Sequence, residues 1–358
     1  MLLDRPTSSE DSRALSRSAT PRWPALDGLR GIAILLVIAS HFGLGGTGGM
    51  VGVTLFFVLS GFLITYLLLD EREQTGGIDL RAFYGRRALR LLPALTFYLV
   101  GMAMLIWVLQ LAIPIWETTW PTALYLANYS QVLGVDLVAH RHTWSLAVEE
   151  HFYLVWPLLV VLGATKRVRP LAIAVGCLAI WRLVVGSLDP VWAYMGTDTN
   201  AYALGAGCLL AVLRHQDVRV RLPRRSAEVG IGALVLLSVV PFTDLEHLYR
   251  MGVWLPVLGA LASCVLIWAS IDHKPALLGG RTVVWLGGIS YALYLWHAPI
   301  LLLPVFDGPV GNLVALGVSI GLATVSWTLI EGPISRSRLR RRLTSRNPPA
   351  NPSLESAA

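Results

Sequence analysis

Residues 51–69 read VGVTLFFVLSGFLITYLLL, and none of these side chains is charged. An α-helix rises about 1.5 Å per residue, so this stretch spans about 28 Å, close to the roughly 30 Å hydrocarbon core of a bilayer. A run this long and this apolar predicts a transmembrane helix. Within it, Gly52, Ser60 and Gly61 are small residues of the kind that let membrane helices pack closely.

The rest of the chain has the same character. Of its 358 residues, 55% are hydrophobic and only 14% are charged, whereas a soluble protein has about 25% charged residues. The mean hydropathy is +0.61. Further apolar segments lie at 28–43, 91–113, 144–163, 169–187, 200–213, 227–241, 249–271, 283–304 and 311–331, and the polar stretch at 114–143 has the composition of an outer loop. We therefore predict an all-α fold, a polytopic transmembrane bundle of about ten helices.

Basic residues predict the orientation of this bundle. Of the 29 Lys and Arg residues, 26 lie in the termini and alternate connections. Arg141 and Arg250 lie in the remaining connections, and Arg182 lies within a segment. Because cytoplasmic loops are enriched in Lys and Arg, we expect both termini to be cytoplasmic. We then attribute the net charge of +7 to basic loops beside the anionic lipids of the cytoplasmic leaflet rather than to nucleic-acid binding.

One membrane domain and two tails make up the predicted organisation. Residues 1–25 are polar and contain no signal-peptide core, and residues 335–358 are basic and then rich in Pro and Ser. We predict disordered cytoplasmic tails there and a transmembrane domain over 26–334. The three cysteines lie in apolar stretches without metal-ligand spacing, so we expect no metal site and no permanently bound cofactor.

Two ionisable residues share one face of the first apolar segment. Arg30 and His41 are eleven positions apart, which returns them to the same helix face with a rise of roughly 16 Å. Arg30 would lie at the cytoplasmic mouth and His41 in the outer half of the membrane. Ionisable groups at this depth are costly and often functional. A helix–helix hydrogen bond is an equal alternative for a single histidine.

The fourth segment carries two adjacent acids, Glu149 and Glu150. We predict Glu149 near the depth of His41, where a carboxylate and an imidazole would form a general base with its orienting partner. Glu150 must face another direction, and an ion pair with a neighbouring helix is an equal alternative for it. Arg182 is expected to pair with an acid inside the bundle.

Two further motifs place polar groups near the ends of segments. Arg87 and Arg90 lie on one helix face, and guanidinium groups match the geometry of phosphate. The alternative is ordinary positive charge on a cytoplasmic loop. In the ninth segment Tyr291 and Tyr294 share a face and His297 reaches the outer half of the membrane. The alternative there is aromatic packing.

Taken together, these stretches resemble the acyltransferase-3 family of integral membrane O-acyltransferases over nearly the whole chain, from Leu26 to Glu331. Each motif is weak alone, but six in the family's order are specific. The motifs are Arg30-x10-His41, Phe56–Phe62, Arg87-x-x-Arg90, Trp144–Tyr153, Ser290–His297 and Glu331-x-Pro333. Because the chain ends soon after the tenth segment, it resembles the stand-alone members without an extracytoplasmic hydrolase-like domain.

The resemblance implies an acyltransferase of a bacterial-type cell membrane. Its co-substrate would be an acyl-CoA, often acetyl-CoA, with the phosphates on Arg30, Arg87 and Arg90. His41 would be a general base or a transient acyl carrier, and Glu149 would orient it or balance its charge. The acceptor would be a hydroxyl of an envelope glycan, a glycolipid or a small molecule such as a macrolide. The residues expected to contact the acceptor or shape the site are Trp144, Glu150, Tyr153, Tyr291, Tyr294 and His297.

Two other functions compete with this hypothesis. A transporter of a lipid-linked sugar or polar metabolite would use intramembrane His, Glu and Arg as binding or relay groups. No internal repeat of the kind found in many transporters is evident in the sequence. A non-catalytic partner in envelope assembly would not need both His41 and Glu149. The ordered motifs favour the enzyme.

Overall fold

The computed structural model describes residues 23–42, 46–218, 220–306 and 308–336, and every regular element in these ranges is a helix. The predicted tails lie almost entirely outside them. The long helices are α2 (Pro24–His41), α3 (Gly48–Thr75), α4 (Leu80–Val108), α7 (Trp144–Val161), α8 (Val168–Leu188), α10 (Thr197–His215), α11 (Ser226–Ser238), α12 (Leu245–His273), α13 (Arg281–Leu301) and α14 (Gly308–Val325). The short ones are α5 (Ile115–Ala123), α6 (Ala127–Val132), η1 (Val138–Thr143), α9 (Pro190–Met195), η2 (Pro304–Phe306), η3 (Ser326–Glu331) and α15 (Gly332–Arg336).

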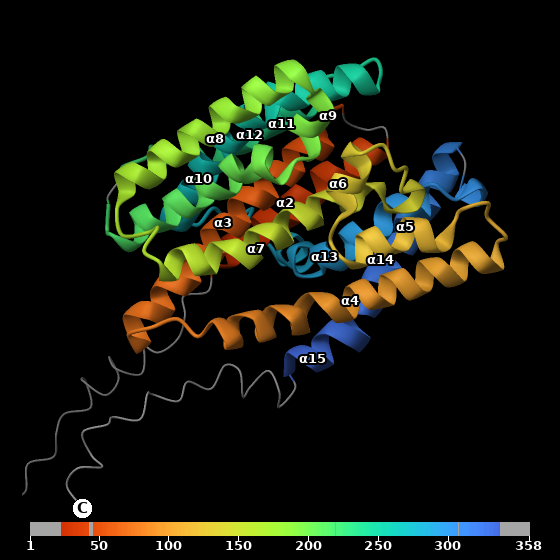
Figure 1. Ribbon diagram of the computed structural model, residues 1–358, viewed down its shortest axis with the longest axis horizontal. Helices are drawn as coiled ribbons and strands as arrows, with labels where there is room; N and C mark the ends of the chain where they lie inside the picture. The colour runs from red at the N-terminus through yellow and green to blue at the C-terminus, as the bar shows by residue number, and fades with distance from the viewer. Residues whose placement is uncertain (1–22, 43–45, 219, 307, 337–358) are drawn as a thin grey trace, which may run out of the picture.

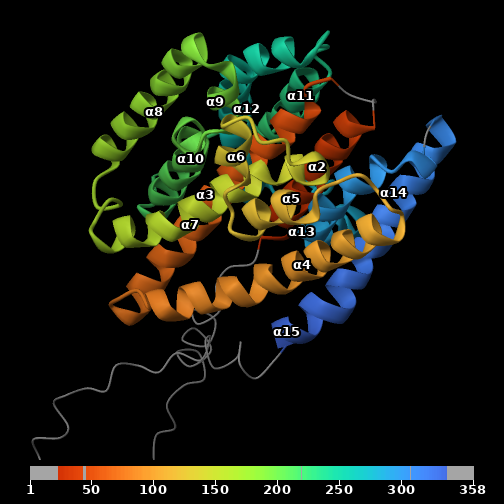
Figure 2. The same ribbon diagram turned by 45° about the vertical axis from the view of Figure 1, so that its right-hand side comes forward.

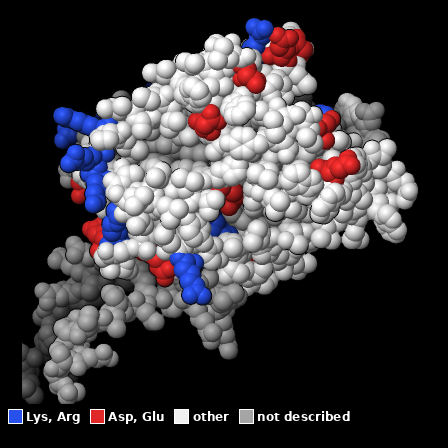
Figure 3. All heavy atoms as spheres, in the orientation of Figure 1, with Lys and Arg blue, Asp and Glu red and all other residues white. Residues whose placement is uncertain are grey.

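Helix α3 is the centre of the bundle, because it packs against α2, α7, α10, α11 and α12 (Figures 1 and 2). Its most apolar stretch is 78% buried, whereas the corresponding stretches of α8 and of the helix from Gly308 to Ile334 are only 22% buried. These outer helices expose large apolar side chains such as Ile180 and Leu313. Most of the surface visible in Figure 3 is uncharged. Such a surface suits a bundle surrounded by lipid.

The all-α polytopic fold is therefore confirmed. Seven helices among the described residues are long and apolar enough to cross a membrane, namely α2, α3, α4, α8, α12, α13 and α14 with its continuation. Helices α7, α10 and α11 coincide with three more predicted segments but fall short of that length or hydropathy. The number of ten spans and the cytoplasmic location of the termini stay predictions.

Helix α4 begins earlier than the predicted segment at 91–113, and the reason is a local cap. The side chain of Asp79 accepts a hydrogen bond of 2.8 Å from the backbone N–H of Ala82. This bond satisfies one of the free donors in the first turn of the helix. Arg87 and Arg90 therefore lie within a helix, three positions apart on one face, rather than in the connection before it.

The polar stretch at 114–143 is folded against the bundle as α5, α6 and η1. His140, His142 and Thr143 in η1 are buried. Helix α7 follows η1 directly at Trp144. The first turn of α7 is therefore covered by the preceding segment instead of marking the membrane surface.

Glycines allow the closest contacts between helices. A Cβ atom on Gly61 of α3 would collide with the backbone carbonyl of Leu204 on α10, and one on Gly207 of α10 would collide with the carbonyl of Val58 on α3. A Cβ on Gly52 of α3 would collide with the backbone of α2 in the same way. The predicted packing role of these small residues in α3 is confirmed.

The prediction that Arg182 pairs with an acid is wrong. Its guanidinium donates hydrogen bonds to the backbone oxygens of Ala193, Thr199, Gly252 and Val253 and to Oδ1 of Asn200. The oxygen of Ala193 lies in the last turn of the short helix α9, where carbonyl groups have no partner inside the helix. Carbonyl groups therefore compensate this buried cation where a carboxylate was expected.

We expect Gly61→Val to weaken the contact between α3 and α10, because the added side chain must push the backbone of Leu204 away. Overpacking of this kind costs about 1–3 kcal/mol, so the melting temperature of the detergent-purified protein should fall. Gly176→Val on α8 is the matched control, because a Cβ there meets no atom within 4 Å. Equal melting temperatures for the two variants would contradict the role assigned to Gly61.

Candidate functional site

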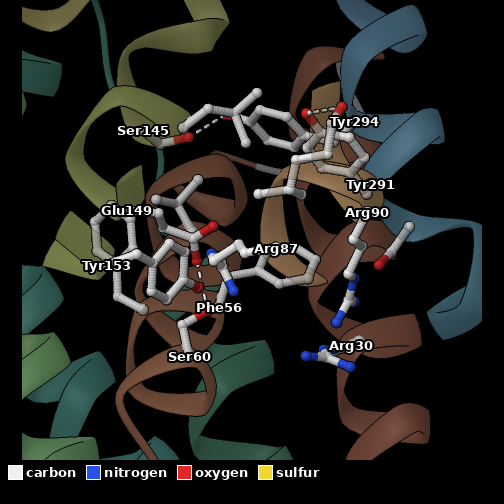
Figure 4. A pocket seen from close by; sticks show the side chains of 15 residues that line it. Arg30, Phe56, Ser60, Arg87, Arg90, Ser145, Glu149, Tyr153, Tyr291 and Tyr294 are labelled. Carbon is white, nitrogen blue, oxygen red and sulfur yellow. Dashed lines mark hydrogen bonds between the residues drawn. The ribbon is translucent and has the colours of Figure 1, made fainter. Parts of the chain in front are cut away.

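An internal cavity has two adjoining parts. Helices α2, α3, α4, α7 and α13 line the inner part, and residues of η3 and α15 also line the wider part. The inner part, called the pocket, has a volume of about 80 Å³, and its polar lining includes Ser60, Arg87, Ser145, Glu149, Tyr153 and Tyr294 (Figure 4). The wider part, called the vestibule, has a volume of about 680 Å³, and its lining includes Trp23, Asp27, Leu89, Trp327 and Glu331. Both parts share Arg30, Arg90, Ser290 and Tyr291. The two parts therefore adjoin at these four residues, and the pocket is the smaller of the two.

All three arginines predicted to bind phosphate line this cavity. Arg30 and Arg90 line both parts, whereas Arg87 lines the pocket only. The guanidinium of Arg30 lies 3.6 Å from the carboxylate of Asp27. Among the described residues, none forms an ion pair or hydrogen bond with the exposed side chain of Arg90. Positive charge is therefore least compensated where the vestibule meets the pocket (Figure 4).

Arg87 has a different environment. Its guanidinium lies 3.4 Å from the carboxylate of Glu150, and its central carbon lies 2.9 Å from the centroid of the Tyr153 ring. Ion pairing and stacking on an aromatic face are both characteristic of arginine. The ion pair confirms the alternative interpretation of Glu150. The charge of Arg87 is therefore already compensated inside the pocket.

Hydrogen bonds define the wall and the closed end of the pocket. In the wall, Ser60 Oγ donates to the carboxylate of Glu149 at 2.6 Å. One turn away on α7, Ser145 Oγ pairs with the hydroxyl of Tyr294 at 2.7 Å, and that hydroxyl donates to the backbone oxygen of His142 at 2.8 Å. Ser145 and Tyr294, called the closing layer, lie at the end of the pocket away from Arg30 (Figure 4).

His41 does not line the pocket. It is the last residue of α2, and its side chain is exposed. Its Nδ1 lies 2.8 Å from the backbone oxygen of Val37, and this nitrogen must carry the hydrogen because a carbonyl oxygen only accepts. Nε2 is then the basic nitrogen. The His41 ring lies 4.9 Å from the buried ring of His297, which lies 5.4 Å from that of His142, measured between centroids.

The predicted pair of His41 and Glu149 is not formed. Each side chain has another partner, and no hydrogen bond or ion pair joins the two within the part of the chain that the structure describes. The prediction assumed that Trp144 marks the outer surface. In the structure η1 precedes α7 directly, and Glu149 accepts a hydrogen bond from Ser60 in the pocket wall. Glu149 is therefore not positioned to orient the imidazole of His41.

The remaining predicted residues lie in the pocket or beside it. Tyr291 lines the cavity, and its hydroxyl donates to the backbone oxygen of Leu91 at 3.3 Å. Trp144 packs against the pocket residue Phe57 with ring centroids 6.3 Å apart. His297 is buried and lies outside the pocket lining. Within the described ranges, no group of three His, Cys, Asp or Glu side chains is arranged to hold a metal ion.

The sequence did not identify several polar residues of the cavity, nor the buried His142 beside it. Ser60, Ser145 and Ser290 each lie in a motif that was recognised, and an isolated hydroxyl in an apolar run was the signal available for them. His142 lies in a stretch predicted to be a polar loop. No local pattern there predicts its burial, because its neighbours come from α13, which is remote in sequence.

A polar cavity inside a bundle of apolar helices defines a polytopic membrane protein with an internal, charged site. The family model that matches the chain is that of acyltransferase-3, described as an acyltransferase domain, and the match covers residues 23–330. The protein belongs to this family, which confirms the resemblance found in its sequence motifs.

Curated relatives are named as O-acetyltransferases. The peptidoglycan O-acetyltransferase OatA of Listeria monocytogenes is 33% identical over 88% of this chain and 56% of its own length. The putative peptidoglycan O-acetyltransferase YrhL of Bacillus subtilis is 33% identical over 88% and 55%. The O-acetyltransferase OatA of Staphylococcus aureus is 29% identical over 92% and 60%. The chain thus spans little more than half the length of these relatives, and no solved structure matches it.

Removing one partner of the ion pair between Arg87 and Glu150 should destabilise the protein more than removing both. Arg87→Met leaves a partly buried carboxylate unpaired, at a cost of about 2 kcal/mol. Adding Glu150→Gln should restore most of the lost melting temperature in detergent. Purely additive losses would show that the two side chains do not interact.

Proposed function

We propose that the protein is a membrane O-acyltransferase that moves an acyl group, most simply acetyl, from cytoplasmic acyl-CoA to a hydroxyl of a cell-envelope glycan on the other side of the membrane. The observation that carries this proposal is the pair of adjoining cavities, which begins near the first turns of α2 and ends at Ser145 and Tyr294, where the Tyr294 ring lies 5.4 Å from that of His297, the neighbour of His41. Family membership supports acyl transfer. The names of the relatives support an acetyl group and a glycan acceptor.

The vestibule is the proposed site of the donor's phosphates. The basic residues of the sequence predict that this end of the bundle faces the cytoplasm. Arg30 and Arg90 line the junction of vestibule and pocket, and guanidinium groups bind phosphate oxygens with directed, charge-assisted hydrogen bonds. Arg87 would contribute less to phosphate binding, because Glu150 already compensates its charge.

The two parts of the cavity differ in volume, and each would hold a different end of the donor. The vestibule of about 680 Å³ is wide enough for a nucleotide, whereas the pocket of about 80 Å³ admits only a narrow chain. The thioester arm of acyl-CoA is such a chain. With the phosphates at Arg30 and Arg90, the arm would run past Glu149 towards Ser145 and Tyr294.

His41 is the proposed base for the acceptor hydroxyl. Its side chain is exposed beyond the closing layer, and the bond from Nδ1 to Val37 leaves Nε2 to accept a proton. The hydroxyl oxygen attacks the thioester carbon and its proton passes to Nε2. The C–S bond then breaks, the electron pair leaves with the sulfur, and the thiolate takes the proton from His41. The products are an O-acyl glycan and CoA with a free thiol. An acyl group carried transiently on Nε2 is the alternative route.

The closing layer must open during this reaction. Ser145 and Tyr294 seal the pocket through their mutual hydrogen bond, and His41 lies on the other side of it. The bond joins α7 to α13, so a small displacement of either helix would connect the thioester to His41. The layer would then keep donor and acceptor apart until both are bound.

We expect His41→Ala to lower acceptor-dependent acyl transfer by about 1,000-fold or more while the protein remains folded, because it removes the only proposed base. The measurement is release of free CoA thiol by purified protein in liposomes supplied with acetyl-CoA and glycan acceptors. His247→Ala is the control, because His247 lies outside the cavity and its ring contacts Thr243. Wild-type turnover by His41→Ala would refute the mechanism.

Arg90→Ala should raise the KM for acyl-CoA by about 10-fold, because it removes a charged hydrogen-bond donor to phosphate, and should change the acceptor KM little. Arg86→Ala is the matched control, since Arg86 pairs with Glu71 at 3.2 Å and does not line the cavity. Steady-state kinetics with each substrate varied in turn measure both constants. An unchanged donor KM would count against phosphate binding at Arg90.

A further inference from the structure

A second cavity lies apart from the pocket and the vestibule, at the end of the bundle where α10 and α12 finish. It has a volume of about 470 Å³, and its lining comes from the last turns of these two helices and from residues 220–222, which follow α10. It shares no lining residue with the pocket or the vestibule, and we call it the peripheral cavity. The basic residues of the sequence predict that it lies at the cytoplasmic surface of the membrane.

Hydrogen bonds hold the walls of the peripheral cavity together. The indole Nε1 of the buried Trp268 donates to the backbone oxygen of Val220 at 3.1 Å. His273 Nε2 lies 3.2 Å from the backbone oxygen of Leu222 and must donate to it, because a carbonyl oxygen only accepts. The guanidinium carbon of Arg214 lies 5.6 Å from the centroid of the Trp268 ring. Residues of α10, of α12 and of the segment after α10 thus form one connected wall.

The arginine and aspartate side chains of the peripheral cavity leave one positive charge in excess. Arg214 and Asp272 form an ion pair, with Nη1 2.7 Å from Oδ1, so their charges compensate each other. Arg221 is exposed, and within the described ranges no carboxylate pairs with it and no hydrogen bond engages its side chain. Guanidinium groups bind phosphate oxygens with charge-assisted hydrogen bonds. A phosphodiester, which has one negative charge, would therefore complement this lining.

An exposed apolar face of α12 leads to the peripheral cavity. Leu258, Leu261 and Val265 are 45%, 61% and 39% exposed. Their spacing of three and four residues continues to Trp268 and Asp272, which line the cavity, so all five lie on one face of the helix. From Leu258 to Trp268 the helix rises about 15 Å, which is half of the roughly 30 Å hydrocarbon core of a bilayer. The face therefore has the length of one layer of acyl chains and ends at the charged cavity.

We propose that the peripheral cavity binds the phosphate of an anionic phospholipid whose acyl chains lie against the exposed face of α12. Basic pockets between transmembrane helices at the cytoplasmic surface bind head groups of this kind. The apolar face favours a lipid over a soluble phosphate, because only a lipid has chains that would cover Leu258, Leu261 and Val265. The site is separate from the pocket and the vestibule, so the inference does not depend on the proposed acyl transfer.

The test measures lipid binding to the full-length protein in detergent by native mass spectrometry. The probes are phosphatidylglycerol, which is anionic, and phosphatidylcholine with the same acyl chains, which has no net charge. The wild-type protein should bind one phosphatidylglycerol about fivefold more tightly than phosphatidylcholine, and Arg221→Gln should weaken the binding of phosphatidylglycerol about fivefold. Arg224→Gln is the matched control, because Arg224 is also exposed but does not line the cavity. It should change the affinity by less than about twofold.

Asp272→Asn tests the same site in the opposite direction. The substitution removes the carboxylate of the lining and releases Arg214 from its ion pair. Two positive charges then lack a partner, so phosphatidylglycerol should bind about fivefold more tightly. A misfolded variant would lose binding, so this gain cannot come from damage to the fold. Glycerophosphoglycerol, the soluble head group alone, should not displace the lipid at about a 100-fold excess, because it has no acyl chains to bury.

The results distinguish a lipid site from its alternatives. Weaker binding in Arg221→Gln, unchanged binding in Arg224→Gln and tighter binding in Asp272→Asn support the lipid site. Equal losses in the two arginine variants, or no gain in Asp272→Asn, would show only a general attraction to a basic surface and would overturn the proposal. Equal affinity of the wild-type protein for the two lipids, or displacement by glycerophosphoglycerol, would overturn it as well. None of these outcomes bears on acyl transfer.

Discussion

Buried guanidinium groups stay inside a lipid-surrounded bundle only when carboxylates, carbonyls or a ligand compensate their charge. The structure shows the first two of these solutions. Carbonyl oxygens surround Arg182, and Glu150 pairs with Arg87 beside Tyr153. Arg90, whose side chain is exposed at the junction of vestibule and pocket, has neither kind of partner within the described ranges. The guanidinium without a partner thus lies where an anionic ligand can reach it. In the proposed activity, the phosphates of the donor would compensate this charge.

Close packing of α2 against α13 fixes the relative positions of the residues along the cavity. A Cβ on Gly287 of α13 would collide with the backbone carbonyl of Asp27 on α2, so the two helices run in contact from the vestibule onwards. Residues spaced along α13 then follow the length of α2: Tyr291 at the cavity junction, Tyr294 in the closing layer and His297 beside His41. A single helix pair therefore places a residue of the cavity, a residue of the closing layer and the histidine proposed as the base in order along its length.

Local sequence predicted the helices well, because long apolar runs and helix periodicity are properties of adjacent residues. It also placed Arg87 and Arg90 on one face and identified the motifs that line the cavity. It failed where the outcome depends on remote contacts. The hydrogen bond between Glu149 and Ser60 joins α7 to α3, and the burial of His142 follows from its contact with α13. Arg182 shows the same limit, since its carbonyl partners come from several elements.

The hydrogen bond between Ser145 and Tyr294 has a consequence for the cell as well as for catalysis. A cavity wide enough for a nucleotide at one membrane face, with an exposed histidine near the other, comes close to being a pore. If the two were joined by water, protons would cross the bilayer and dissipate the transmembrane potential, which is worth about 2.3 kcal/mol per charge at 100 mV. The hydroxyl groups of Ser145 and Tyr294 and the rings beside them would thus also keep protons from crossing the bilayer along this cavity.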